Sequence, residues 1–126
     1  MKRHAAREKA FQLLFQLDMI EEDIEQEIQE RLDEEDKDEF LHSLVTGVVL
    51  NKQAIDDAIS ANLENWSLNR LPAVEKTILR IATFEFNFVE DVPTNVSINE
   101  AVELAHRYGD EKSGKFVNGV LSKIMK

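Results

Sequence analysis

The stretch Ala73–Phe88, AVEKTILRIATFEFNF, decides the fold of this chain. Pro72 suits the first turn of a helix, and Glu90-Asp91-Val92-Pro93 ends it. The apolar residues of this helix fall on almost every side of it: Val74, Ile78, Ile81, Phe84 and Phe88 on one side, and Leu79, Ala82 and Phe86 on others. A helix that is apolar all round is buried on several sides. We therefore expect it at the centre of the molecule.

Amphipathic helices are predicted before this central stretch. Apolar residues at helical spacing indicate one helix over about Arg3–Leu17 and a second over about Glu21–Leu32. The same spacing continues from near Lys37 to Leu63, which predicts a single long third helix. Together these form a three-helix unit.

Two further helices are predicted after the central stretch. Ser97-Ile98-Asn99-Glu100 has the pattern of a capping box and predicts a helix start. Gly109 is a natural residue to end that helix, and Ser113 or Gly114 opens the last one.

Helix formers dominate the chain, which has four Gly and two Pro, and alternation typical of strands is scarce. The predicted fold class is all-α, with about seven helices. We expect one domain over residues 1–126, made of two small helical bundles at about 1–64 and 65–126 that share one core.

Composition excludes several kinds of protein. Cysteine is absent, which rules out disulfides, thiolate metal sites and cysteine nucleophiles. No apolar run approaches the roughly 20 residues that cross a bilayer, and no secretory signal follows the basic N-terminus. We expect a cytoplasmic protein with no membrane partner.

Charge is distributed unevenly along the chain. The net charge is −10, yet the first nine residues hold four Lys and Arg against one Glu, and Arg107–Lys126 holds five against two. Asp18–Glu39 contains thirteen carboxylates. This segregation suggests that the two basic ends meet in one cationic surface for a polyanion.

Aromatic residues accompany the basic ones. Arg7, Phe11 and Phe15 form an i, i+4, i+8 row off the main apolar face of the first helix. Cations beside exposed rings are what single-stranded RNA recognition requires, because bases stack and phosphates need positive charge. The alternative for Phe11 and Phe15 is packing against the second bundle.

A second basic segment lies near the start of the last helix. Lys112 and Lys115 stand where backbone N–H groups favour anions, and Phe116 is either another stacking ring or part of the core.

Catalytic and metal-binding patterns are lacking. His4, His42 and His106 are far apart in sequence, and neither an HExxH motif nor a Ser–His–Asp arrangement is present. Gly119 is followed by Val120-Leu121 rather than by the Lys-Ser/Thr of a P-loop. We expect no enzyme activity, no metal and no cofactor.

Several ungapped blocks resemble the NusB family of bacterial transcription antitermination factors, over nearly the whole chain. The blocks are Ala6-Arg7-Glu8 with Ala10 and Gln12-Leu13, VEKTILRIA at 74–82, Asp91-Val92-Pro93, INEAVELA at 98–105 and KFVNGVL at 115–121.

The resemblance implies an all-helical, non-catalytic protein. Family members bind boxA RNA, a short single-stranded element of ribosomal RNA leaders, together with NusE, a small-subunit ribosomal protein. The complex joins elongating RNA polymerase with other Nus factors and suppresses premature termination.

The resemblance also implies a set of RNA-binding residues. Arg3 and Arg7 fall on the family's arginine-rich N-terminal motif, Phe15 on an aromatic RNA contact, and Lys112, Lys115 and Phe116 on the C-terminal part of the same surface. The motif is thinner here, with His4, Ala5 and Ala6 where some relatives carry Arg, and Lys112 stands where an acidic residue can occur. The predicted RNA-binding residues are Arg3, His4, Arg7, Phe15, Lys112, Lys115 and Phe116.

Two other functions fit the sequence. Domains of this kind also begin ribosomal RNA methyltransferases, but such enzymes continue into a cofactor domain, and this sequence ends at Lys126 without a glycine-rich loop. A purely protein-binding scaffold would instead use the acidic helix faces.

Overall fold

The computed structural model describes residues 2–18, 30 and 38–125. These residues form six α-helices and one 3-10 turn, and none of them lies in a strand. The helices are α1 (Arg3–Leu17), α3 (Glu39–Leu50), α4 (Lys52–Ser60), α5 (Ala73–Phe88), α6 (Thr94–Tyr108) and α7 (Glu111–Met125), with the turn η1 at Leu68–Arg70. The predicted all-α class is confirmed, whereas the predicted helix at about Glu21–Leu32 lies outside the described residues.

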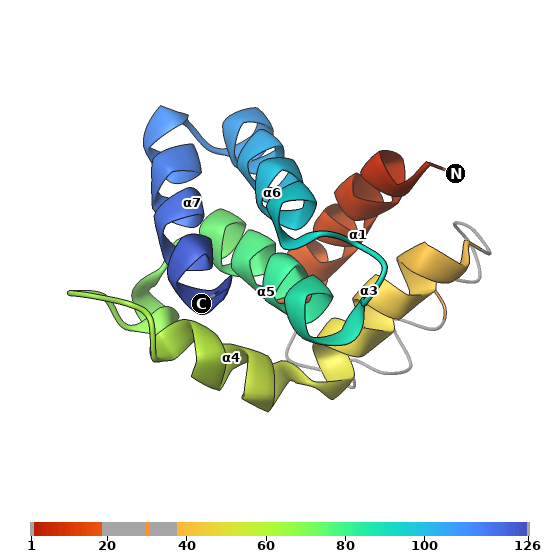
Figure 1. The fold of residues 1–126 in the computed structure, drawn as a ribbon, viewed down its shortest axis with the longest axis horizontal. Helices are drawn as coiled ribbons and strands as arrows, with labels where there is room; N and C mark the ends of the chain where they lie inside the picture. Colours follow the sequence, from red (N-terminus) through yellow and green to blue (C-terminus); the bar gives the residue numbers. More distant parts are fainter. Residues whose placement is uncertain (1, 19–29, 31–37, 126) are drawn as a thin grey trace.

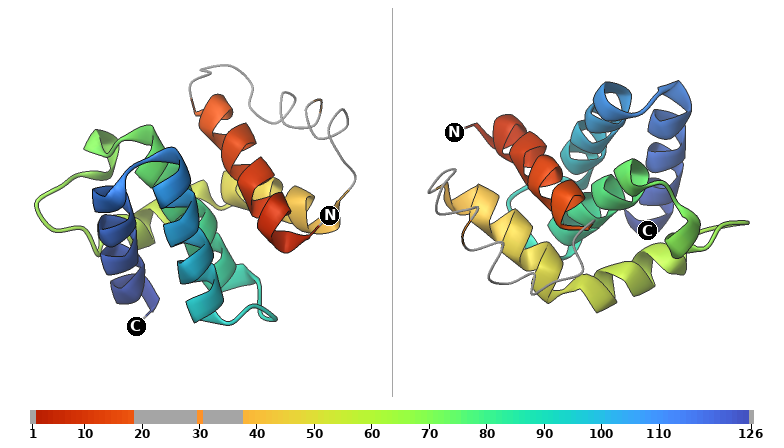
Figure 2. Two further views of the ribbon diagram at one scale, coloured as in Figure 1. Left: turned by 90° about the horizontal axis from the view of Figure 1, so that it is seen from above. Right: turned by 180° about the vertical axis from the view of Figure 1, so that it is seen from behind.

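Helix α5 lies at the centre, as its apolar residues predict. It packs against all five of the other described α-helices. In Figures 1 and 2, α6 and α7 form an antiparallel pair on one side of α5, while α1 and α3 lie on the other and α4 crosses below. Every face of α5 is therefore covered by a neighbour.

One continuous core joins both halves of the chain. Its largest fully buried apolar side chains come from α3, α4, α5 and α7: Leu41, Leu44, Val45, Ile55, Ile59, Ile78, Leu79, Val117 and Leu121. Burying a side chain of this size stabilises the fold by about 1.5–3 kcal/mol. No helix in the described ranges has the length and apolarity needed to cross a membrane.

The long helix predicted from Lys37 to Leu63 is wrong, because the chain breaks at Asn51. Asn51 has φ −110° and ψ 19°, and it separates α3 from α4. Its side-chain Nδ2 donates to the carbonyl oxygen of Gly47 at 2.8 Å and shares that acceptor with its own backbone N–H, at 3.0 Å. Asparagine often competes with helix backbone in this way.

The predicted starts of the last two helices are also wrong by a few residues. Helix α6 begins at Thr94, directly after Pro93, and Ser97 is buried inside it. Helix α7 begins at Glu111, because Asp110 accepts from the backbone N–H of Ser113 at 2.9 Å while the Ser113 hydroxyl accepts from the Asp110 N–H at 3.2 Å. The predicted end of α6 at Gly109 is confirmed.

Candidate nucleic-acid interface

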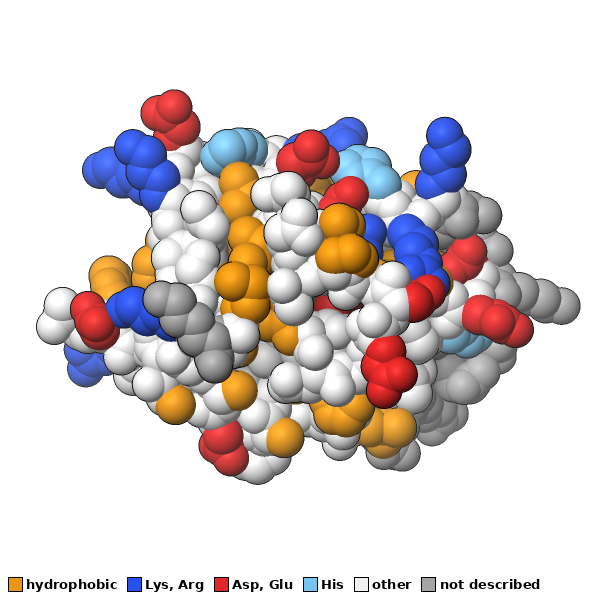
Figure 3. Space-filling view, in the orientation of Figure 1, with side chains coloured by type: hydrophobic (Ala, Val, Ile, Leu, Met, Phe, Trp, Pro, Cys, Tyr) orange, Lys and Arg blue, Asp and Glu red, His pale blue; other side chains and the backbone are white. Residues whose placement is uncertain are grey.

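The two basic ends of the chain both lie against α6, which runs between α1 and α7 (Figure 1). His4 of α1 bonds Glu100 near the start of α6, whereas Gly114 of α7 closely approaches His106 near its end. These two contacts are six residues apart on α6, about 9 Å along the helix. Between them, Arg107 Nη1 donates to Glu8 Oε2 at 3.0 Å and the Tyr108 hydroxyl donates to Glu8 Oε1 at 2.7 Å. The two basic ends therefore meet directly, as expected, and together with α6 they form one strip that runs from Arg3 and His4 to Lys112 and Lys115. Figure 3 shows Lys, Arg and His side chains along the upper edge, where these helices lie.

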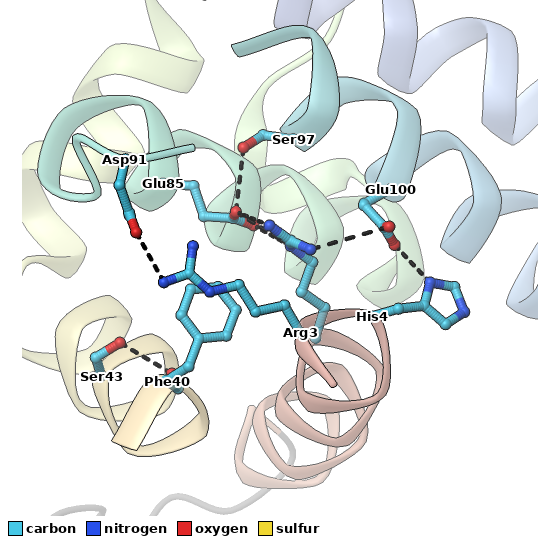
Figure 4. A network of polar contacts seen from close by, with 9 residues as sticks. Arg3, His4, Phe40, Ser43, Glu85, Asp91, Ser97 and Glu100 are labelled. Atoms are coloured by element: carbon cyan, nitrogen blue, oxygen red, sulfur yellow. Dashed lines mark hydrogen bonds and ion pairs between the residues drawn. The ribbon is translucent and has the colours of Figure 1, made fainter. Parts of the chain in front are cut away.

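Arg3 and His4 occupy one end of this strip, both exposed and both paired with carboxylates (Figure 4). The Arg3 guanidinium donates to Asp91 Oδ2 at 3.0 Å. His4 Nδ1 lies 2.6 Å from Glu100 Oε2 and 3.6 Å from Glu103 Oε2. The hydrogen bond with Glu100 raises the pKa of His4 above its ordinary 6.5. The imidazole therefore keeps its positive charge to a higher pH than a free histidine does.

Arg7 is buried in the structure, whereas the sequence predicted an exposed side chain. Its side chain is 4% exposed and forms an ion pair with the equally buried Glu85, Nη2 to Oε1 at 2.7 Å. Ser97 donates to the same carboxylate at 3.1 Å. The expected exposure of Arg7 beside the aromatic rings is wrong, because a buried carboxylate on α5 draws the guanidinium inward.

The two phenylalanines of α1 differ in burial. Phe11 is 2% exposed and packs against Tyr108 of α6, with ring centroids 4.6 Å apart. Phe15 is partly exposed, and its ring stacks on Phe11 at 5.7 Å. Phe11 is therefore a core residue, whereas Phe15 offers ring surface at the edge of the core.

Lys112 and Lys115 are exposed on the first turns of α7, and Phe116 is half-buried beside them. Asp110 caps this helix, and the backbone N–H of Ser113 holds the pKa of its carboxyl below the usual value. Because Asp110 occupies the cap, the two lysines rather than free backbone N–H groups supply the positive charge at this end of the strip.

A pocket of about 280 Å³ opens beside these lysines. Two aromatic side chains, Trp66 and Phe116, line it together with Glu75 and Lys112. Glu75 Oε1 accepts from Ser113 Oγ at 2.5 Å, while Oε2 is buried with no hydrogen-bond partner among the described residues. A buried carboxylate oxygen without a donor is costly.

Sequence reasoning missed Glu75, Trp66 and Glu85. A carboxylate within an otherwise apolar central helix is a signal that could have identified both glutamates, because buried carboxylates need partners. Trp66 carried a weaker signal: it is the one Trp of the chain, in a polar connection, and it is 53% exposed.

Within the described ranges, His4, Glu100 and Glu103 are the one group whose ligand atoms lie close enough to share a metal ion, all within 4.8 Å. Two of the three side chains are exposed, and the hydrogen bond between His4 and Glu100 already accounts for their approach.

A helical scaffold that carries cations and rings in one strip is the kind of surface that single-stranded RNA-binding proteins use. A family model described as the NusB family matches residues 4–126. The transcription antitermination protein NusB of Oceanobacillus iheyensis is 57% identical over 125 residues, which cover 99% of both chains. This chain belongs to the NusB family.

Solved structures agree with this assignment. NusB of T. maritima superposes with a TM-score of 0.88 at 44% identity and covers 99% of this chain, which in turn covers 91% of it. A crystal structure of the antitermination factors NusB and NusE in complex with double-stranded RNA matches with a TM-score of 0.83 at 34% identity, over 99% of this chain and 98% of that one.

Proposed function

We propose that this protein is a non-catalytic, RNA-binding transcription antitermination factor. It binds boxA RNA of ribosomal RNA leaders together with NusE and helps elongating RNA polymerase, in company with other Nus factors, to resist termination. The activity belongs in the cytoplasm, where bacterial transcription takes place. Membership of the NusB family carries this proposal, and the neighbouring NusB–NusE–RNA complex supports RNA and NusE as ligands.

Direct RNA contacts are assigned to the exposed members of the strip. His4, Lys112 and Lys115 provide positive charge for phosphates, and Phe15 and Phe116 provide ring surface for bases. The Arg3 guanidinium is held beside the strip by Asp91 and the Phe40 ring. Arg7 acts differently: its buried ion pair with Glu85 positions α1, and with it the basic N-terminal arm. The N-terminal motif holds fewer arginines in this chain than in some relatives. The N-terminal end of the strip therefore offers fewer contacts to phosphates.

The pocket beside Lys112 is assigned to a nucleobase. Trp66 and Phe116 are aromatic surfaces on which a base can stack, and Glu75 Oε2 needs a donor such as a base amino group. Lys112 lines the same pocket, where its positive charge can bind the phosphate next to that base. The single-stranded RNA proposed here would place one unpaired base in it.

Fluorescence anisotropy with labelled boxA RNA, titrated with and without NusE, tests the proposal. Lys115→Ala and Lys112→Ala should each weaken binding by about three- to tenfold and reduce the salt slope by about 0.7. Lys52→Ala, an exposed lysine on α4, is the matched control and should leave binding unchanged. Equal binding by all three variants would contradict the assigned surface, and no binding with or without NusE would contradict the function.

A further inference from the structure

A broad groove of about 980 Å³ lies between the start of α3 and the C-terminal end of α5. Among the described residues that line it, Asp38, Glu39, Glu90 and Asp91 carry carboxylates and Arg3 carries the one basic side chain. Figure 3 shows Asp and Glu side chains gathered on the right side of the molecule. A groove with this charge repels phosphate and attracts cations.

Part of the groove already holds a guanidinium of the chain itself (Figure 4). The Arg3 guanidinium lies 4.5 Å from the centroid of the Phe40 ring and donates to Asp91 Oδ2 at 3.0 Å. An aromatic face beside a carboxylate is a favourable site for arginine, because cation–π attraction and a charge-assisted hydrogen bond act together.

The rest of the groove also combines an aromatic ring with carboxylates, and no basic side chain of the described residues other than Arg3 lines it. The Phe88 ring is 49% exposed and stacks on Phe84, with centroids 5.2 Å apart. Glu39 and Glu90 are exposed at the same groove, and neither has an ion-pair partner among the described residues. A half-exposed ring with two unpaired carboxylates is thus complementary to arginine.

We propose that this groove docks an arginine-bearing basic segment of a partner protein. Charge complementarity favours such a segment over RNA, and the seating of Arg3 on Phe40 shows the mode in which its side chains would bind. The proposal rests on the proposed function only in supposing that the protein works with a protein partner.

The groove does not overlap the pocket beside Lys112 that is assigned to a base. The groove lies at the C-terminal end of α5, at Phe88, whereas Glu75 and the base pocket lie at its N-terminal end. Thirteen residues of helix separate the two by about 20 Å. A partner segment and a base could therefore be bound at the same time.

A fluorescein-labelled arginine hexapeptide, titrated into the full-length protein without RNA, tests the proposal by anisotropy. We expect saturable binding that Phe88→Ala and Glu90→Gln each weaken by about three- to tenfold. Asp57→Asn, which removes an exposed carboxylate of α4 outside the groove, is the matched control and should change little. A lysine hexapeptide should bind more weakly than the arginine peptide, because guanidinium stacks better on a ring.

Arg3 supplies a second test, since it competes for the groove. Arg3→Gln should strengthen peptide binding by about three- to tenfold, whereas Lys2→Gln, which removes the same charge from the neighbouring exposed residue, should not. Equal weakening by Glu90→Gln and Asp57→Asn would mean that peptide binds the acidic protein unspecifically, and it would overturn the proposal. Because no RNA is present, failure of boxA binding leaves this result intact, and the reverse also holds.

Discussion

The Arg7 guanidinium and the Glu85 carboxylate form a two-point ion pair across the contact between α1 and α5. Nη2 of Arg7 donates to Oε1 at 2.7 Å, and Nε donates to Oε2 at 3.0 Å. The two side chains are 4% and 1% exposed. Ser97 of α6 donates to the same carboxylate, so one buried charge links three helices.

Arg7→Ala should lower the free energy of unfolding by about 3–5 kcal/mol, because Glu85 would be left buried without its counter-ion. Arg7→Met combined with Glu85→Leu should recover a large part of that loss, since apolar side chains of similar volume avoid the desolvation cost. Urea unfolding measures both. Arg3→Ala is the control: its ion pair with Asp91 is exposed to solvent and should contribute little to stability.

A stable Arg7→Ala variant that loses RNA affinity would contradict this role. It would mean that the guanidinium leaves Glu85 and contacts phosphate. Retained stability in Arg7→Ala, with or without loss of RNA binding, is therefore the decisive observation against a positioning role.

The same residues show how far sequence reasoning reaches. The central place of α5 could be predicted, because apolar side chains all round a helix leave it no solvent face. The pairing of Arg7 with Glu85 could not be predicted, because the two residues are 78 positions apart and no local sequence pattern indicates it. Phe11 illustrates the same limit: it stands off the main face of α1, yet Tyr108 of α6 covers it.

Ser97 shows how a local pattern is overridden. Ser97-Ile98-Asn99-Glu100 fits a capping box, but Ser97 donates its hydroxyl to Glu85 and Glu100 bonds His4. Both polar side chains have found partners on other helices, so the helix starts earlier, after Pro93. Of the predicted RNA-binding residues, Arg3, His4, Lys112 and Lys115 are exposed, and their role in RNA binding stays a prediction. The pocket could not be predicted, because only the fold brings Glu75 and Trp66 beside Phe116.

Two glycine substitutions should have opposite effects on stability. A Cβ on Gly47 would lie 2.2 Å from the Phe84 ring, which is buried and cannot move aside. Gly47→Ala should therefore destabilise the protein by about 1–3 kcal/mol. A Cβ on Gly119, inside α7, meets no atom within 4 Å, so Gly119→Ala should stabilise by about 0.5–1 kcal/mol. Thermal unfolding compares the two, and the same sign for both would contradict the close packing of α3 on α5.

RNA affinity should depend on pH through His4. Its pKa is raised above 6.5 by the hydrogen bond with Glu100, so the interaction is fully present below 6.5 and is lost as the pH rises through the raised value. Loss of the imidazolium removes positive charge from the RNA-binding strip, and affinity for boxA RNA should fall over the same interval. NMR titration of the His4 ring gives the pKa, and anisotropy at matched ionic strength gives the affinity.

Two variants isolate this histidine. Glu100→Gln should lower the His4 pKa towards 6.5, because it removes the charged acceptor. His4→Arg should abolish the pH dependence of binding in this interval, since arginine stays charged. An unchanged pH profile in His4→Arg would assign the titration to another group.

The base pocket makes the sharpest prediction about RNA. Trp66 is 53% exposed, so Trp66→Ala should leave the fold intact while weakening binding by about 1–3 kcal/mol through loss of a stacked base. Glu75 Oε2 has no donor of its own, and the amino group of a guanine would supply one. Replacing the RNA guanines one at a time by inosine, which lacks that amino group, should weaken binding by the wild-type protein at one position. The same replacement should cost Glu75→Met much less, because a methionine side chain has no oxygen to accept the hydrogen bond. If every inosine affects the two proteins equally, the carboxylate does not contact guanine, and the pocket binds its base by stacking alone.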